Sequence, residues 1–194
     1  MKRFLLLLAL VLLGGCALSS REPVDVVDRE ALSGALWKVE ISQWGTVRFT
    51  GLLAPRLETE KGILHYVLLD GTGIKLLEAR VRPNGKQQII QVVKMLHKYH
   101  LPVFMADSLS RIFLVEPELD RSPVGRLVRF DREQPDELLM RKLARVGPVC
   151  LWSVDYSLAP NTKQPAEITY IMPWLGMRLS LVKLDRLSPS LSQR

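Results

Sequence analysis

Two histidines, His97 and His100, lie three residues apart near the middle of the chain and are the first candidates for metal chemistry. Imidazoles at this spacing can reach one metal ion from the same face of a helix. No third or fourth ligand lies nearby in the sequence, and the ammonium group of Lys98 would repel a cation. The pattern therefore favours a solvated helix end, and we expect neither a metal ion nor a cofactor.

Two further positions could take part in catalysis. Asp70-Gly71-Thr72-Gly73 is similar to the Asp-Thr-Gly of aspartic proteases, but that mechanism needs two carboxylates and no second copy occurs. The glycines are also what a hairpin turn requires. Cys150 lies in an apolar run without a basic neighbour to favour its thiolate, which is typical of a buried, inert thiol. Because no nucleophile, base and orienting group converge, we do not expect an enzyme.

A cysteine near the N-terminus points to lipid attachment. Lys2 and Arg3 precede an apolar run over 4–13, which is too short to span a bilayer and is typical of a secretory signal. The following Leu13-Gly14-Gly15-Cys16 resembles the lipobox of bacterial lipoproteins, in which the cysteine is lipidated after residues 1–15 are removed. The alternative is an ordinary signal with a chance cysteine. By the same resemblance, Ala17 rather than Asp indicates the outer membrane, with the protein facing the periplasm.

Charge and cysteine content limit the partners of such a protein. Cleavage before Cys16 reduces the 27 basic groups to 25, against 20 acidic ones, and so leaves a formal net charge of +5. No cluster of Arg and Lys is interleaved with stacking aromatic residues, so an anionic membrane surface is a better partner than nucleic acid. Cys150 has no partner once Cys16 carries lipid, and we expect no internal disulfide.

Hydrophobic periodicity predicts the elements that would position these groups. Residues 16–33 are interpreted as a lipidated N-terminus and flexible tether, 34–187 as one domain, and 188–194 as a polar tail. Apolar and polar residues alternate near 37–42 and 47–53, the run 63–69 is apolar on both faces except for His65, and 74–81 is interpreted as the next strand, which predicts an antiparallel meander of four strands. The same alternation predicts three more strands near 152–156, 168–172 and 177–181.

Between the two groups of strands the period changes to that of a helix. Apolar stripes predict one helix over 89–99 and a second from Pro102 to just before Pro117, which together form a helical hairpin. Residues 135–147 are interpreted as a further helix, with a strand as the alternative. We therefore expect a mainly β fold with a helical insertion (α+β), in which helices pack on the concave side of one curved antiparallel sheet. The alternative is a closed sandwich with the hairpin outside.

Large apolar side chains recur at regular positions of these elements. They are Trp37, Phe49, Tyr66, Trp152 and Tyr170 on the strands, and Leu101, Met105 and Leu109 on the second helix. Plain core packing explains them. If the helices fill the curved sheet incompletely, the same residues line an apolar cavity that binds acyl chains. The three helical residues would then form a movable lid, and Pro102 would mark its hinge.

The order of these segments resembles the LolA/LolB family of lipoprotein-sorting proteins. The matching segments are the lipobox at Cys16, the Trp37 strand, Phe49-Thr50-Gly51-Leu52, Leu69-Asp70-Gly71-Thr72, the helices interrupted at Leu101-Pro102, and the segments 152–156, 165–169 and 176–181. The resemblance implies an unclosed antiparallel β half-barrel, capped on its concave face by a helical hairpin, whose cavity holds the acyl chains of a lipoprotein. The family's insertase exposes a hydrophobic residue on a strand-connecting loop, whereas this chain carries Asp70 there.

Two functions of different classes follow. The first is an outer-membrane-anchored lipoprotein that binds acyl chains or lipoprotein cargo in an apolar cavity and takes part in their transfer. The second is a non-catalytic scaffolding lipoprotein that docks another envelope protein. An empty interior would favour the first function, and a filled core would favour the second.

The lipobox makes a direct prediction about the N-terminus. Mass spectrometry of the N-terminal peptide of the purified protein should show a lipid-modified Cys16 as the first residue, because the lipobox resemblance implies lipidation and removal of residues 1–15. The two or three acyl chains of such a modification would anchor the protein stably where one chain would not. An unmodified peptide that begins at another residue would contradict the lipoprotein interpretation.

Overall fold

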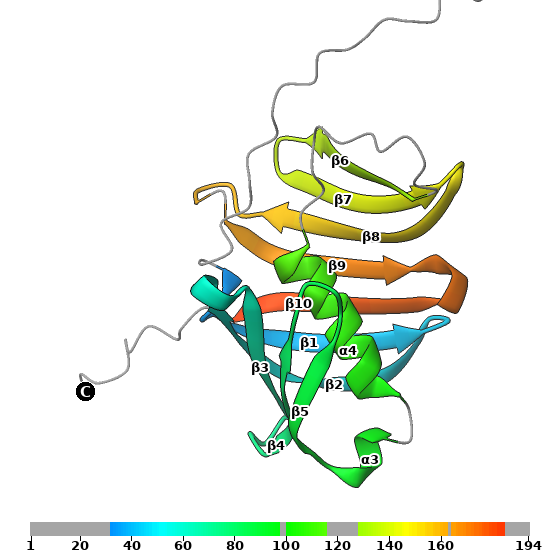
Figure 1. Cartoon of the computed structure of the whole chain (residues 1–194). Coiled ribbons are helices and arrows are strands. Elements are labelled where there is room, and N and C mark those ends of the chain that lie inside the picture. Colours follow the sequence, from blue (N-terminus) through cyan, green and yellow to red (C-terminus); the bar gives the residue numbers. More distant parts are fainter. Residues whose placement is uncertain (1–31, 98–99, 116–127, 163, 185–194) are drawn as a thin grey trace, which may run out of the picture.

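The computed structural model describes residues 32–97, 100–115, 128–162 and 164–184 of the chain. These residues form one open antiparallel sheet of ten strands in the order β5-β4-β3-β2-β1-β10-β9-β8-β7-β6 (Figure 1). The strands β5 and β6 lie at its two edges. The mainly β prediction is therefore confirmed, and within the described part of the chain a single sheet replaces the two sheets of the alternative sandwich.

The ten strands share antiparallel pairing along their whole order. Their bounds are β1 Leu36–Gln43, β2 Thr46–Glu58, β3 Ile63–Leu69, β4 Lys75–Val81, β5 Gln87–Val92, β6 Arg129–Asp136, β7 Leu139–Val146, β8 Val149–Leu158, β9 Pro165–Met172 and β10 Met177–Leu184. The helical elements are η1 Thr59–Lys61, α3 Lys94–His97, α4 Leu101–Leu109, η2 Ser110–Leu114 and η3 Pro173–Leu175.

The strand β1 joins the two halves of the sheet. It pairs with β2 on one side and with β10 on the other, so the first and last described strands are neighbours. Its core face carries Trp37, Val39 and Ile41, all fully buried, and Lys38 alternates with them on the exposed face. All seven predicted strands are present.

Two helix predictions are wrong. Residues 87–92 form the edge strand β5, and only Lys94–His97 of the predicted helix over 89–99 is helical. Residues 135–147 also form no helix, because β6 ends at Asp136 and β7 runs from Leu139 to Val146. Backbone pairing with β4 makes residues 87–92 a strand. Pairing with β6 and β8 does the same for β7.

The second predicted helix is confirmed and is the main helical element. Helix α4 begins at Leu101 after His100, whose φ of 50° places it in the left-handed region, and Pro102 lies in the first turn. It continues into the π-helical η2 and ends at Leu114. Because α3 is a single turn, the expected hairpin is reduced to one helix, which crosses one face of the sheet (Figure 1).

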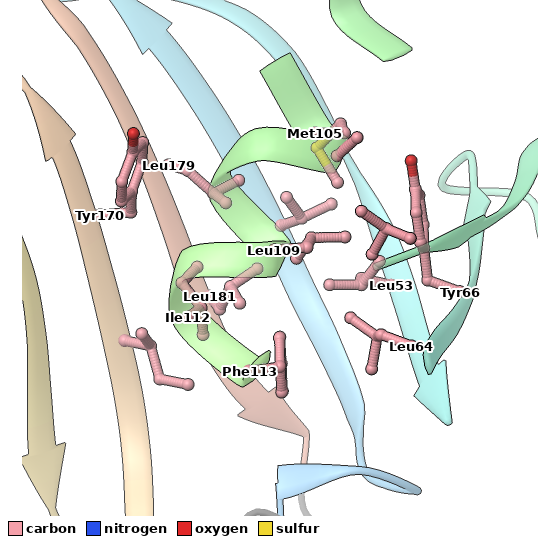
Figure 2. Packing of buried hydrophobic residues seen from close by; sticks show 14 of the residues in the cluster. Leu53, Leu64, Tyr66, Met105, Leu109, Ile112, Phe113, Tyr170, Leu179 and Leu181 are labelled. Carbon is pink, nitrogen blue, oxygen red and sulfur yellow. The ribbon is translucent and has the colours of Figure 1, made fainter. Parts of the chain in front are cut away.

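The core lies between this helix and the sheet. In Figure 2, Met105, Leu109 and Phe113 face strand residues of both halves of the sheet, among them Leu53 and Leu181. The core extends to Leu32, which falls within the expected tether yet is buried, and its carbonyl accepts a hydrogen bond of 3.2 Å from Trp37 Nε1. Ordered structure therefore begins at least two residues before the predicted domain boundary.

The packing of α4 predicts that substitutions at two positions of this helix change the free energy of unfolding by very different amounts. Leu109→Ala should lower the free energy of unfolding by about 2–5 kcal/mol, because Leu109 is fully buried and the variant leaves a cavity. Val103→Ala, at a position 54% exposed, should change it by less than about 0.5 kcal/mol. Urea titration followed by circular dichroism measures both values, and equal losses would contradict this packing.

Candidate functional site

The eight residues predicted to bind acyl chains lie together in the structure. Phe49 is partly buried, and the others are buried in the same cluster: Trp37, Tyr66, Leu101, Met105, Leu109, Trp152 and Tyr170. Five come from the sheet face, and the three predicted lid residues lie on α4. The structure thus brings the predicted set together, with α4–η2 seated on the apolar face. Whether these residues bind an acyl chain stays a prediction.

An aromatic row leads from this core to the edge of the sheet. The ring of Phe104 on α4 lies 6.1 Å from that of Tyr170, which lies 6.5 Å from Trp152. The row ends at Phe130 on β6, whose ring is 6.1 Å from Trp152 and is partly exposed. Tilted rings at these distances pack favourably beyond their buried area. The row is a chain of ring contacts from the partly exposed Phe130, through the buried Trp152 and Tyr170, to the helix.

Arg111 of η2 lies over the middle of this row. Its guanidinium carbon is 5.5 Å from the centre of the Trp152 ring and 5.8 Å from that of Tyr170, which allows cation–π attraction to both. The guanidinium also donates a hydrogen bond to the Tyr170 hydroxyl. Burial raises the pKa of Tyr170 to about 12, and the charge of Arg111 partly offsets that rise. Arg111 therefore places a cation where the helix meets the aromatic row.

A buried lysine holds the end of the helix. Lys142 of β7 donates hydrogen bonds from Nζ to the carbonyl of Ile112 at 3.0 Å and to that of Val115 at 3.1 Å. The Tyr156 hydroxyl donates to the same Ile112 carbonyl at 2.6 Å, and Nζ lies 5.1 Å from the centre of the Tyr156 ring. Carbonyls at a helix C-terminus lack intrahelical donors and attract cations. We call Lys142 and Tyr156 the polar clasp.

The hydroxyl of Tyr66 is buried on the sheet face and has no hydrogen-bond partner among the residues that the structure describes. Burial raises the pKa of Tyr66 above its usual range, so the neutral form persists. An unpaired buried hydroxyl costs free energy, and a polar group that entered this space could satisfy it.

The loop between β3 and β4 carries an exposed apolar residue, Ile74. The Asp70 carboxylate accepts hydrogen bonds from the backbone amides of Thr72 at 2.8 Å and Ile74 at 2.9 Å, which confirms the predicted turn. The Thr72 hydroxyl also donates to this carboxylate at 2.6 Å, and that bond, followed by the backbone ones, holds the pKa of Asp70 below its usual range. The ordered turn presents Ile74 to solvent. Asp70 thus shapes the loop, and Ile74 is an exposed apolar side chain on it.

The remaining candidates from the sequence form no site in the described residues. His97 lies at the end of α3 and His100 is exposed, and no cluster of three or more His, Cys, Asp or Glu side chains is found in the ranges that the structure covers. Cys150 is a free, half-buried thiol whose Sγ lies 3.5 Å from the Trp152 carbonyl. Cys16 and the segments 1–15 and 188–194 lie outside the described residues.

Sequence reasoning missed the polar residues of the site. Arg111, Lys142 and Tyr156 form side-chain hydrogen bonds with residues 27 to 59 positions away in the chain, and no local pattern marks such pairs. The available signal was Lys142 itself, because it stands between Met140 and Ala144 on one face of β7. A lysine is almost never buried without polar partners.

Comparison with known proteins adds no further assignment, because no family model and no curated protein sequence matches this chain. Across the residues that the structure describes, no helix is both long enough and apolar enough to cross a membrane. The site must therefore be interpreted from its own geometry.

The polar clasp predicts how firmly the helix is held. Lys142→Met keeps the side-chain length but removes two charge-assisted hydrogen bonds, so backbone amides of α4–η2 should exchange with deuterium about tenfold faster or more. Lys38→Met, on the exposed face of β1, should leave these rates unchanged. Hydrogen exchange with mass spectrometry measures both variants. Unchanged exchange in Lys142→Met would show that the clasp does not hold the helix.

Proposed function

We propose that this chain is a non-catalytic, outer-membrane-anchored lipoprotein that binds acyl chains or lipoprotein cargo between its sheet and helix α4–η2. In this proposal the open sheet acts as an unclosed half-barrel, and the helix is the lid on its concave face. Lipid on Cys16 anchors the protein, and the domain faces the periplasm. The observation that carries the proposal is that one helical element of 14 residues covers the apolar face of a ten-stranded sheet.

Three features support a lid that moves. The left-handed backbone of His100 precedes α4 and can serve as a hinge. At the other end, the polar clasp holds carbonyls of η2 by hydrogen bonds, which can break and form again without loss of packing within the sheet. The aromatic row gives an entering acyl chain an apolar path that begins at the exposed Phe130.

The ligand would gain most of its binding energy from apolar burial, at about 25 cal/mol for each Å² removed from water. Part of this gain is offset by displacement of Met105 and Leu109 from the sheet. Arg111 offers a cation to an acyl carboxylate or phosphate, and Tyr66 offers an unpaired hydroxyl. The exposed Ile74 loop is in keeping with delivery of cargo into a bilayer.

The alternative function is a non-catalytic scaffolding lipoprotein that docks another envelope protein. The observation that favours it is the complete burial of most predicted cavity residues, which a permanently filled core would also produce. The two functions differ in whether α4 leaves the sheet when acyl chains are present.

Binding of a fluorescent acyl probe to the full chain tests the proposal. Phe49→Glu should abolish saturable binding at micromolar concentration, because it places an unpaired charge on the apolar face at a position that is only partly buried. Thr50→Glu, exposed on the next residue of the same strand, is the matched control and should bind like the wild type. Circular dichroism checks that both variants are folded.

The outcome separates the two functions. Equal binding by both variants would mean that the probe does not enter between sheet and helix. If the folded wild-type chain binds neither the acyl probe nor a lipoprotein, the carrier proposal fails and the scaffolding function takes its place.

A further inference from the structure

Three neighbouring hairpin turns at one end of the sheet expose large apolar side chains. They are the turns β1–β2, β9–β10 and β7–β8, which lie on the right in Figure 1. Trp44 is 70% exposed, Trp174 is 62% exposed and Val149 is 58% exposed, and Val47 and Leu175 lie beside them. We call these residues the tryptophan rim. The turns at the other ends of the same strands, at 137–138 and 159–164, carry no aromatic residue.

The backbone at Trp44 is unusual. Trp44 has a φ of 51° and Gly45 a φ of 78°, so both central residues of the β1–β2 turn lie in the left-handed region. Such a turn favours Asn-Gly or Gly-Gly, and a bulky residue at its first position costs free energy. The conformation of the turn therefore does not favour tryptophan at this position. A side chain that is both locally costly and largely exposed indicates a role in contact with something outside the chain.

The two tryptophans are held in place. The Trp44 amide donates to the Gly176 carbonyl at 2.8 Å, and the Trp44 ring lies so close to Gly176 that a Cβ there would clash at 2.3 Å. Trp174 Nε1 donates to the Leu151 carbonyl at 3.1 Å. Both rings are thus fixed at the surface, which lowers the entropy lost when they bind a partner.

The charge around the rim is positive. The segments 43–49, 145–150 and 171–178 contain Arg48, Arg145 and Arg178 and no Asp or Glu. Arg145 pairs with Asp131 and Glu133, whereas Arg48 and Arg178 are exposed and form no ion pair within the described residues. Tryptophan is enriched where membrane meets water, and arginine binds anionic headgroups. A rim of indoles flanked by two unpaired arginines matches an anionic bilayer surface.

We propose that the tryptophan rim docks on an anionic lipid bilayer, with Trp44 and Trp174 inserted at the headgroup level. This surface is distinct from the space between sheet and helix and does not depend on acyl binding there. The docking is also compatible with the proposed lipid on Cys16. Sixteen Cα–Cα steps lead from Cys16 to Leu32 and can span at most about 55 Å, twice the roughly 26 Å length of β1.

Quenching of tryptophan by brominated lipids tests the docking. The full chain is reconstituted in vesicles of phosphatidylethanolamine and phosphatidylglycerol, with and without bromine on the acyl carbons next to the headgroups, where indoles at the headgroup level can contact it. Bromine quenches only on contact, so Trp44 and Trp174 should lose emission, while the buried Trp37 and Trp152 should not. The variant Trp44→Phe/Trp174→Phe should lose the quenching but keep its fold. Arg48→Glu/Arg178→Glu should weaken the quenching, as should neutral phosphatidylcholine vesicles.

A matched control fixes the direction of docking. Leu138→Trp, added to the Trp44→Phe/Trp174→Phe background, places an indole on the turn at the opposite end of β7, where it should not be quenched. All variants share the same N-terminus, so attachment of the chain to the vesicle through the N-terminus is the same in each of them.

Three results would overturn the proposal. The first is a wild type without bromolipid quenching, and the second is quenching that persists in the double Phe variant. The third is tryptophan shielding that follows protein concentration rather than lipid, which would make a second copy of the chain the partner of the rim.

Discussion

The central physical constraint is that an open sheet with one apolar face must cover that face. The helix α4–η2 does this with residues from four successive turns, among them Met105, Leu109 and Phe113. The two ends of the helix differ, because one begins after the left-handed residue His100 and the other is held by the buried ammonium of Lys142. Burial of a lysine costs free energy, and the hydrogen bonds to the helix carbonyls and the nearby Tyr156 ring help to offset that cost. The sheet therefore binds helix α4–η2 at its C-terminal end, where carbonyl groups would otherwise be left unpaired.

The sequence predicted the strands whose alternation is regular, and it failed where the core face carries an unexpected residue. In β7 the inward positions are Met140, Lys142 and Ala144, so a lysine stands where the pattern requires an apolar side chain. Because Lys142 interrupts the alternation of apolar and polar residues, the sequence pattern predicts a helix over 135–147 instead of a strand. In β5 the apolar residues fit helical spacing, but pairing with β4 made 87–92 an edge strand. Both errors reflect tertiary context, which local periodicity does not contain.

The candidate site was predicted in its apolar part only. Aromatic residues on strand faces could be identified because alternation predicts which side chains point inward, and Tyr66 and Tyr170 are indeed buried. The polar part depends on contacts such as Arg111 with Tyr170 and Tyr156 with Ile112, which the fold brings together across long stretches of chain. Their geometry turns a plain core into one with a cation over an aromatic row. It also determines which end of the helix is held by reversible bonds.

The tryptophan rim and the aromatic row are adjacent, and this links the two proposals. Trp174 of the rim bonds to the Leu151 carbonyl, and Leu151 directly precedes Trp152 of the row. The exposed end of the row, Phe130, contacts the Trp152 ring. A bilayer that received Trp174 at its headgroup level would therefore lie next to the outer end of the apolar path. An acyl chain leaving that bilayer would meet Phe130 and Trp152 first and Arg111 next, so little apolar surface would cross water during transfer.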